Sequence, residues 1–175
     1  EKDGYSGCIA VWDSIFKRDI IENEGIQFFS ERDVYSEDLL FKLMFMTHAK
    51  KIAFCTEAVY LYRVNDTSFT HRIDVSVLKR IVNLYNEVCI LFGDVLKDYN
   101  LKRRIINRTF FTLRFNINKI SKTRDAKDFY RILLNDQEIM RVIDLYQPTN
   151  LKNIVVYYSL KWKLIRVFEI LSKIN

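Results

Sequence analysis

Residues that interrupt regular secondary structure are scarce in this chain. Four glycines and one proline occur among 175 residues, and Pro148 lies in segment 147–150, the clearest break in the sequence. Glycine and proline disfavour helix interiors, so their scarcity excludes collagen-like repeats and favours a largely helical protein. Hydrophobic residues make up 49% of the chain and charged residues 29%. This balance allows a buried core and excludes intrinsic disorder.

Cysteine and histidine are also few. Cys8, Cys55 and Cys89 are far apart in apolar neighbourhoods, and they form neither a CxxC motif nor a disulfide framework. We therefore expect reduced core cysteines of a cytosolic protein. His48 and His71 lack an HExxH or HxH neighbour, so a histidine-built metal site has little support.

Long apolar runs are missing as well. No stretch reaches the roughly 18 residues that indicate a membrane span, and the first residues do not form a secretory signal. The chain starts at Glu1 without Met, which is typical of a cut inside a longer protein. We expect a cytoplasmic location, at most peripheral on the inner face of the cell membrane.

The positive charge is concentrated in the second half. Residues 1–100 carry 12 Lys and Arg against 16 Asp and Glu, a net of −4, and residues 101–175 carry 16 against 6, a net of +10. A basic half indicates an anionic partner such as a membrane surface, although a solvated helical face explains the charges equally well. Nucleic-acid binding is disfavoured, because no recognised reader motif is present.

In the first part of the sequence, the pattern predicts two helices. One covers residues 12–24 and stops at Gly25, a natural residue after a helix end. The other begins at Ser36 as its cap, carries Glu37 and Asp38 in its first turn, and has an apolar body that we expect to be buried on most sides. These acids could simply complement the helix dipole, which is worth roughly 0.3–1 kcal/mol.

Two strand-like runs follow, at residues 51–55 and 58–64. An isolated pair of strands is marginal, so this pair would sit at the edge of a larger sheet. Such an exposed sheet edge invites pairing, so a homodimer is possible. After residue 73 the apolar spacing predicts helices at about 74–98, 101–121, 125–135, 137–146 and 151–174.

The last of these helices is basic and amphipathic. From Tyr157 to Ile174, apolar residues recur every three or four positions, and the polar positions carry four cations against the single acid Glu169. Such a helix can lie on an anionic bilayer with its apolar face in the headgroup boundary. The pattern of residues 157–175 therefore predicts contact with an anionic membrane surface. The competing interpretation is that the apolar face of this helix packs on neighbouring helices.

Five short segments in the first part occur in a recognisable order. They are residues 11–18, 24–28, 35–41, 49–53 and 58–63, with Ser68 a few positions further on. In order and spacing they resemble the C-terminal part of the catalytic domain of family 2 glycosyltransferases, the inverting GT-A enzymes of bacterial polysaccharide synthesis. The resemblance covers about a third of the chain.

The resemblance implies roles for five residues. Asp38 would be the general base that deprotonates the acceptor hydroxyl, and Glu37 would hold the acceptor or the loop. Trp12 would lie under the acceptor site, Arg63 could reach the leaving diphosphate, and Tyr35 would belong to the substrate-binding residues. Trp12 could equally be a core residue.

The resemblance also implies parts that this sequence lacks. It contains neither a nucleotide-binding GxGxxG or P-loop motif nor a DxD pair. The full-length enzyme would hold Mg²⁺ or Mn²⁺ on a DxD motif, and would use a nucleotide sugar and a saccharide or lipid-linked acceptor. The chain alone would be inactive, with no metal site of its own.

We therefore expect an α+β, predominantly α protein. Residues 1–72 would be the C-terminal remnant of a GT-A-like catalytic domain, with two strands and a buried helix. Residues 73–175 would be a helical, bundle-like C-terminal extension. The alternative is a non-catalytic helical binding module that docks on an anionic surface or a partner protein.

Overall fold

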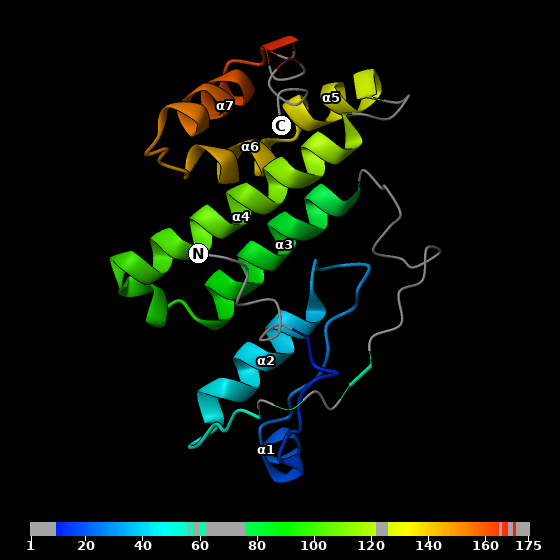
Figure 1. Ribbon diagram of the computed structural model, residues 1–175, viewed down its shortest axis with the longest axis vertical. Helices are drawn as coiled ribbons and strands as arrows, with labels where there is room; N and C mark the ends of the chain where they lie inside the picture. The colour runs from blue at the N-terminus through cyan, green and yellow to red at the C-terminus, as the bar shows by residue number, and fades with distance from the viewer. Residues whose placement is uncertain are drawn as a thin grey trace. The chain divides into compact units, whose positions relative to one another are not determined.

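The chain divides into two compact units, Glu1–Arg72 and Ile73–Asn175. A computed structural model describes residues 10–55, 57, 60, 61, 76–121, 126–164, 166, 167 and 170 (Figure 1). The described residues form helices, turns and irregular segments. The predicted, predominantly helical class is therefore confirmed.

The first unit contains a short helix, α1 (Arg18–Asn23). It ends as predicted at Gly25, whose φ of 60° is left-handed, and the Ile26 amide donates to the Ile21 carbonyl at 3.0 Å. Glycine allows this closing turn because it has no Cβ. The predicted start at residue 12 is wrong: residues 11–13 form a turn, closed by the Ser14 amide on the Val11 carbonyl.

The second helix of this unit, α2 (Glu37–His48), carries the acidic pair in its first turn. Ser36 precedes it, but its φ of 65° is left-handed and its side chain makes no capping bond. Side-chain capping requires an extended N-cap, so the backbone conformation explains the failure of this prediction. A left-handed serine is uncommon.

Burial of α2 changes along its length. Leu40, Phe41 and Lys42 are buried, whereas the last residues of the helix are exposed. Phe28 stacks on Phe41 with ring centroids 4.2 Å apart, and the ring of Phe16 meets Phe41 edge-on at 5.2 Å. The apolar body of α2 is therefore buried or half-buried from residue 37 to residue 45, in line with the expectation, and its last turn is exposed.

The predicted strands are absent from the described residues. Residues 51–55 are irregular and exposed, with Phe54 80% accessible. Of the second run, residues 60 and 61 are described and lie outside any strand, whereas residues 58, 59 and 62–64 lie outside the described part of the chain. An isolated pair of short strands has little to stabilise it, and the expected two-strand remnant is not formed in the part of the first unit that the structure describes.

The cysteine expectation is also corrected. Cys55 is exposed and Cys89 is half-buried, and both are free thiols. Cys55 therefore does not belong to a core. Cys8 lies outside the described residues, as do Arg63, Ser68 and His71.

The second unit is built around two long helices, α3 (Ser76–Leu91) and α4 (Tyr99–Ile120), which lie side by side (Figure 1). A 3₁₀ turn, η3 (Val95–Lys97), comes between them. The predicted helix over residues 74–98 thus ends earlier, at Leu91. Three shorter helices follow: α5 (Ala126–Asn135), α6 (Gln137–Asp144) and α7 (Leu151–Lys161).

The shorter helices assemble around α6, which contacts α3, α4, α5 and α7. Phe110 of α4 is fully buried and stacks on Tyr146, with centroids 3.8 Å apart and planes 5° from parallel. The other fully buried large side chains of this unit are Leu78, Ile81, Val82, Leu113, Ile117, Phe129, Tyr130, Leu133, Val142 and Ile143.

Short polar residues begin three of these helices. The carboxylates of Asp98 and Asp136 accept backbone N–H bonds at the starts of α4 and α6, and the Asn150 side chain accepts from Asn153 N at the start of α7. These caps satisfy donors that have no partner within the helix. They explain why helix starts in this unit lie close to the predicted positions.

The C-terminal helix is shorter than predicted. It ends at Lys161, and Lys163 adopts a left-handed φ of 58°. The Leu164 amide donates to the Ser159 carbonyl at 2.8 Å and the Lys163 amide to the Leu160 carbonyl at 3.1 Å. This is the double bond pattern of a Schellman cap. The continuous amphipathic helix over residues 151–174 is therefore wrong, and residues 171–175 lie outside the described part.

Truncating the stacked core ring should destabilise the second unit strongly. Phe110→Ala leaves a cavity beside Tyr146, and such changes cost about 3–5 kcal/mol. Phe115→Ala is the matched control: Phe115 lies on the same helix but is 67% exposed, so its loss should cost within about 0.5 kcal/mol. Urea unfolding followed by circular dichroism measures both. If both substitutions lower the free energy of unfolding equally, Phe110 is not the central core residue of this unit.

Candidate functional site

The candidate site lies at the start of α2, where Glu37 and Asp38 are both half-buried. Asp38 Oδ2 accepts a hydrogen bond from the backbone N–H of Val11 at 3.2 Å. Asp38 Oδ1 has no hydrogen bond to a described residue. One carboxylate oxygen is thus held by the backbone of a segment 27 positions earlier in the chain.

A second contact attaches the same segment to α2. Lys42 Nζ lies 3.1 Å from Asp13 Oδ1, and the two side chains are 6% and 21% exposed. The Ser14 hydroxyl donates to the same carboxylate oxygen at 2.8 Å. Together with the Val11–Asp38 bond, this ion pair holds residues 11–14 against the first turns of α2.

The Asp13 carboxylate is adapted to this pair. Burial alone would raise the pKa of Asp13, but the hydrogen bonds from Ser14 and Lys42 and the positive charge of Lys42 outweigh it. The net result is a pKa below the ordinary value of 3.8. Asp13 is therefore ionised and paired at neutral pH.

The aromatic side chain of this segment, Trp12, is exposed. Trp12 is 45% exposed, and its ring lies on that of Tyr60 with centroids 4.4 Å apart and planes 34° from parallel. The interpretation of Trp12 as a core residue is wrong. Tyr60 is 50% exposed, so the two rings form an accessible aromatic pair.

Of the two other residues predicted for the site, the structure describes one. Tyr35 is half-buried in the turn before α2. Arg63 lies outside the described residues. The structure therefore joins the Trp12 segment to Asp38 and leaves the diphosphate contact of Arg63 a prediction.

The Asp13–Lys42 pair was missed in the sequence. The available signal was Lys42 itself, a single lysine within the apolar run 39–46. Lysine is almost never fully buried unless it is paired, so a lysine within a buried apolar run is expected to form an ion pair with a carboxylate. Nothing in the sequence identifies Asp13 as that carboxylate.

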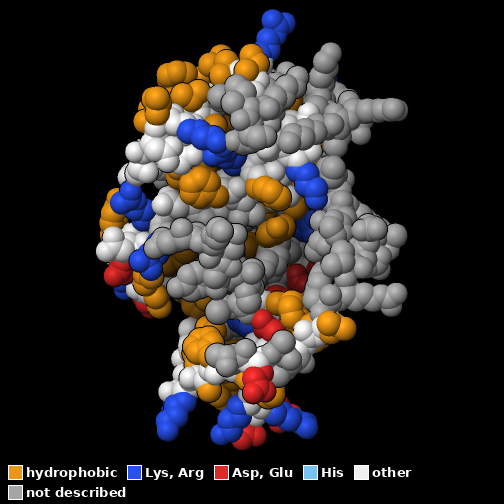
Figure 2. Space-filling model, viewed as in Figure 1, with side chains coloured by type: hydrophobic (Ala, Val, Ile, Leu, Met, Phe, Trp, Pro, Cys, Tyr) orange, Lys and Arg blue, Asp and Glu red, His pale blue; other side chains and the backbone are white. Residues whose placement is uncertain are grey.

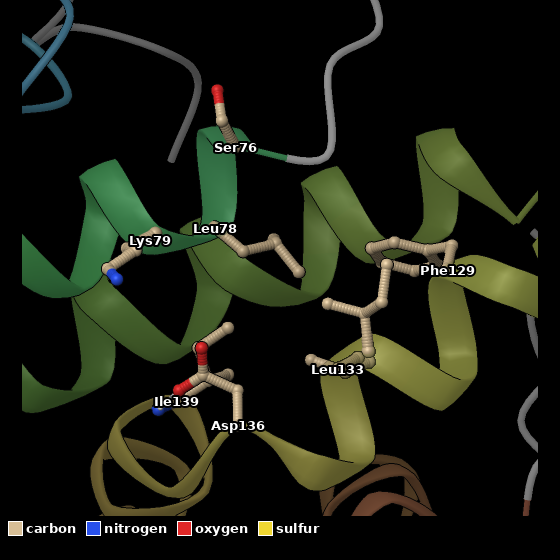
Figure 3. A pocket seen from close by; sticks show the side chains of 8 residues that line it. Ser76, Leu78, Lys79, Phe129, Leu133, Asp136 and Ile139 are labelled. Carbon is tan, nitrogen blue, oxygen red and sulfur yellow. Dashed lines mark hydrogen bonds between the residues drawn. The ribbon is translucent and has the colours of Figure 1, made fainter.

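The second unit holds a small pocket between α3, α5 and the start of α6 (Figure 3). Its volume is about 140 Å³, below the range of about 300–1,000 Å³ typical of ligand sites. The Asp136 carboxylate at its edge is occupied as the cap of α6. The pocket is lined by Ser76, Leu78, Lys79, Phe129, Ile132, Leu133, Asp136 and Ile139. A pocket of this size, whose carboxylate already serves as a helix cap, gives little support for a ligand site.

Two further findings bear on ligands and membranes. In the described part of the chain, no three His, Cys, Asp or Glu side chains lie close enough together to hold a metal ion. None of the described helices combines the length and the apolar character needed to cross a bilayer.

Comparisons with protein-family models, with curated proteins and with solved structures find no match for this chain.

Removing the charge of Asp13 should destabilise the first unit. Asp13→Asn leaves the buried Lys42 ammonium without its counterion, which costs about 3 kcal/mol. Asp19→Asn is the control, because Asp19 pairs with Lys17 at 3.8 Å with both side chains more than 70% exposed. That substitution should change stability by less than about 1 kcal/mol. Unfolding is followed by Trp12 fluorescence in a Trp162→Phe background, and equal effects would refute the buried pair.

The same pair predicts a loss of stability in acid. Because the folded pKa of Asp13 lies below its unfolded value, the stabilisation is complete above the unfolded value of about 3.9. It is lost as the pH falls through the folded pKa. Unfolding curves measured between neutral pH and strong acid should show this loss in wild type and a smaller one in Asp13→Asn. If the free energy of unfolding falls by the same amount in wild type and in Asp13→Asn, the lowered pKa of Asp13 does not stabilise the fold.

Proposed function

We propose that the first unit is the acceptor side of the active site of an inverting glycosyltransferase, with Asp38 as its general base. The observation that carries the proposal is the Val11–Asp38 hydrogen bond at 3.2 Å. It brings the exposed Trp12 ring and the carboxylate into one neighbourhood, although they lie far apart in the sequence. Both belong to the segments that resemble family 2 glycosyltransferases.

The chemistry follows from a carboxylate with one oxygen available. As the acceptor hydroxyl attacks the anomeric carbon of a nucleotide sugar, Asp38 Oδ1 takes its proton. The new C–O bond forms while the bond to the nucleoside diphosphate breaks, and attack from the opposite face inverts the anomeric carbon. Positioned proton transfer of this kind contributes about 10²–10⁴ in rate.

The neighbouring residues have supporting roles in this proposal. Glu37 accepts hydrogen bonds from the acceptor, and the Trp12 ring and Tyr35 border the place where the acceptor sugar lies. Lys42 is neutralised by Asp13 at 3.1 Å, so its ammonium does not compete for Asp38. Holding reactants in place supplies much of the effect of an active site.

Backbone strain next to the acids supports a functional role. Ser36, directly before Glu37, has a φ of 65°. A non-glycine residue in this region costs of order 1–3 kcal/mol, and such residues cluster at active sites where the surroundings enforce them. Ser36 sets the direction in which the chain enters α2, and with it the position of both carboxylates.

The parts absent from this sequence enter the proposal as requirements. A divalent ion on a DxD motif would neutralise the charge that develops on the leaving diphosphate. This sequence contains no DxD pair, so the activity belongs to a protein that also carries the nucleotide-binding half.

Replacing the base should abolish turnover without unfolding the protein. In the protein that carries the nucleotide-binding half, Asp38→Asn keeps an oxygen for the Val11 amide but cannot take a proton. We expect the rate to fall by about 10²–10⁴. Asp19→Asn, an exposed Asp on α1, should leave the rate unchanged. A rate of Asp38→Asn close to that of wild type would exclude Asp38 as the base.

The 175-residue chain alone should bind a nucleoside diphosphate sugar negligibly, with or without Mn²⁺. The reason is that the sequence contains no motif for the diphosphate or its metal ion. Isothermal titration calorimetry is the measurement. Micromolar affinity would show that the chain holds a complete nucleotide site, and the proposal of an acceptor half would fail.

A further inference from the structure

The end of α7 exposes apolar and basic side chains together. Tyr158 is 38% exposed, Trp162 62% and Leu164 45%, and Lys163 and Arg166 are exposed beside them. We call these five residues the Trp162 corner. Figure 2 shows hydrophobic side chains gathered on the surface where α7 lies. Val167 and Ile170 are described further along the chain and are also exposed, by 38% and 60%.

The Trp162 corner is fixed to the core of the second unit. The rings of Trp162 and Tyr158 lie 4.6 Å apart, those of Tyr158 and Tyr157 5.0 Å, and those of Tyr157 and Tyr146 6.2 Å. Tyr157 is 6% exposed and Tyr146 3%. The exposed rings therefore extend from a buried aromatic cluster, and the closing turn of α7 holds Trp162 in place.

The inner face of α7 is already covered. Val156, Tyr157 and Leu160 are 2–6% exposed, so the helix has buried its own apolar stripe within the unit. The exposed apolar side chains of the Trp162 corner lie outside that stripe. They remain 38–62% exposed although Trp162 and Tyr158 stack on each other, and an external apolar surface would cover them further.

The charge around the corner is positive. Residues 151–175 contain five Lys and Arg and one acid, Glu169. Lys161 donates to Tyr157 Oη and lies 3.1 Å from Asp144 Oδ1, contacts that raise its pKa and keep it protonated. Because Asp144 pairs with Lys161, the exposed charges of Lys163 and Arg166 remain for an anionic partner.

We propose that the Trp162 corner docks the second unit on a bilayer that contains anionic lipid. Trp162 and Leu164 enter the headgroup boundary, where tryptophan is favoured, and Lys163 and Arg166 contact lipid phosphates. The docking element is a corner with a left-handed residue, in place of the flat helix predicted from the sequence. This inference is independent of the proposed glycosyl transfer.

The chemistry of the corner favours lipid over nucleic acid. Stacked aromatic rings and cations would also suit single-stranded RNA. However, exposed aliphatic side chains such as Leu164, Val167 and Ile170 gain little from a phosphate backbone, whereas they are stabilised in the acyl boundary of a bilayer. The combination of both kinds of side chain is what the proposal depends on.

The chain allows a direct measurement, because it contains two tryptophans. In Trp12→Phe, all tryptophan fluorescence comes from Trp162. We expect a blue shift and co-sedimentation with vesicles of phosphatidylglycerol and phosphatidylcholine at low salt, both reversed by high salt. Vesicles of phosphatidylcholine alone should give little of either.

Variants test the corner residue by residue. Lys163→Asn with Arg166→Gln removes two charges, and we expect vesicle affinity to fall about 25-fold, at roughly fivefold for each cation. Asparagine is used at position 163 because it tolerates the left-handed backbone. Trp162→Ala should also weaken binding. The matched control removes two exposed cations of the first unit, Lys50→Gln with Lys51→Gln, and should leave binding unchanged.

Four results would overturn the proposal: equal binding to neutral and anionic vesicles, no shift of Trp162 emission, wild-type affinity of the charge variant, or a shift with polyuridylate RNA and none with vesicles. Circular dichroism establishes that each variant is folded. If Trp162→Ala does not fold, the charge variant still decides the question.

Discussion

The arrangement of the candidate site depends on the pairing of one buried lysine. Lys42 lies on the inner face of α2 with 6% of its side chain exposed, and an unpaired ammonium there would be strongly destabilising. Asp13 supplies the counterion, and in doing so brings residues 11–14 onto the helix. The Val11 amide then meets Asp38, and Trp12 is left facing solvent. A structural requirement for charge pairing thus assembles the groups that the proposed function uses.

Much of the helical fold could be predicted, because its signals are local. Gly25 ends α1, and Asp98, Asp136 and Asn150 begin helices through short-range hydrogen bonds. The failures have other causes. The end of α7 depends on Lys163, which adopts a left-handed φ that is more usual for glycine. The strand predicted at residues 51–55 is absent because a strand requires a paired neighbour, which the local sequence pattern cannot show.

The candidate site was only partly predictable. The acidic pair could be found because it follows directly on Ser36 and opens an apolar helix, and both features are local. The Asp13–Lys42 pair could not, because its members are 29 positions apart and meet only through tertiary packing. The exposure of Trp12 was equally hidden, since its apolar neighbours Val11 and Ile15 suggested a core; in the structure Ile15 is fully exposed.

The most direct test of the central claim is chemical rescue of the base. In the protein that carries the nucleotide-binding half, Asp38→Ala removes the carboxylate and leaves space beside the acceptor. If Asp38 takes the proton, added formate should restore turnover of this variant in a concentration-dependent manner and should have no effect on Glu37→Ala. A folded Asp38→Ala variant that retains wild-type turnover without formate would contradict the account.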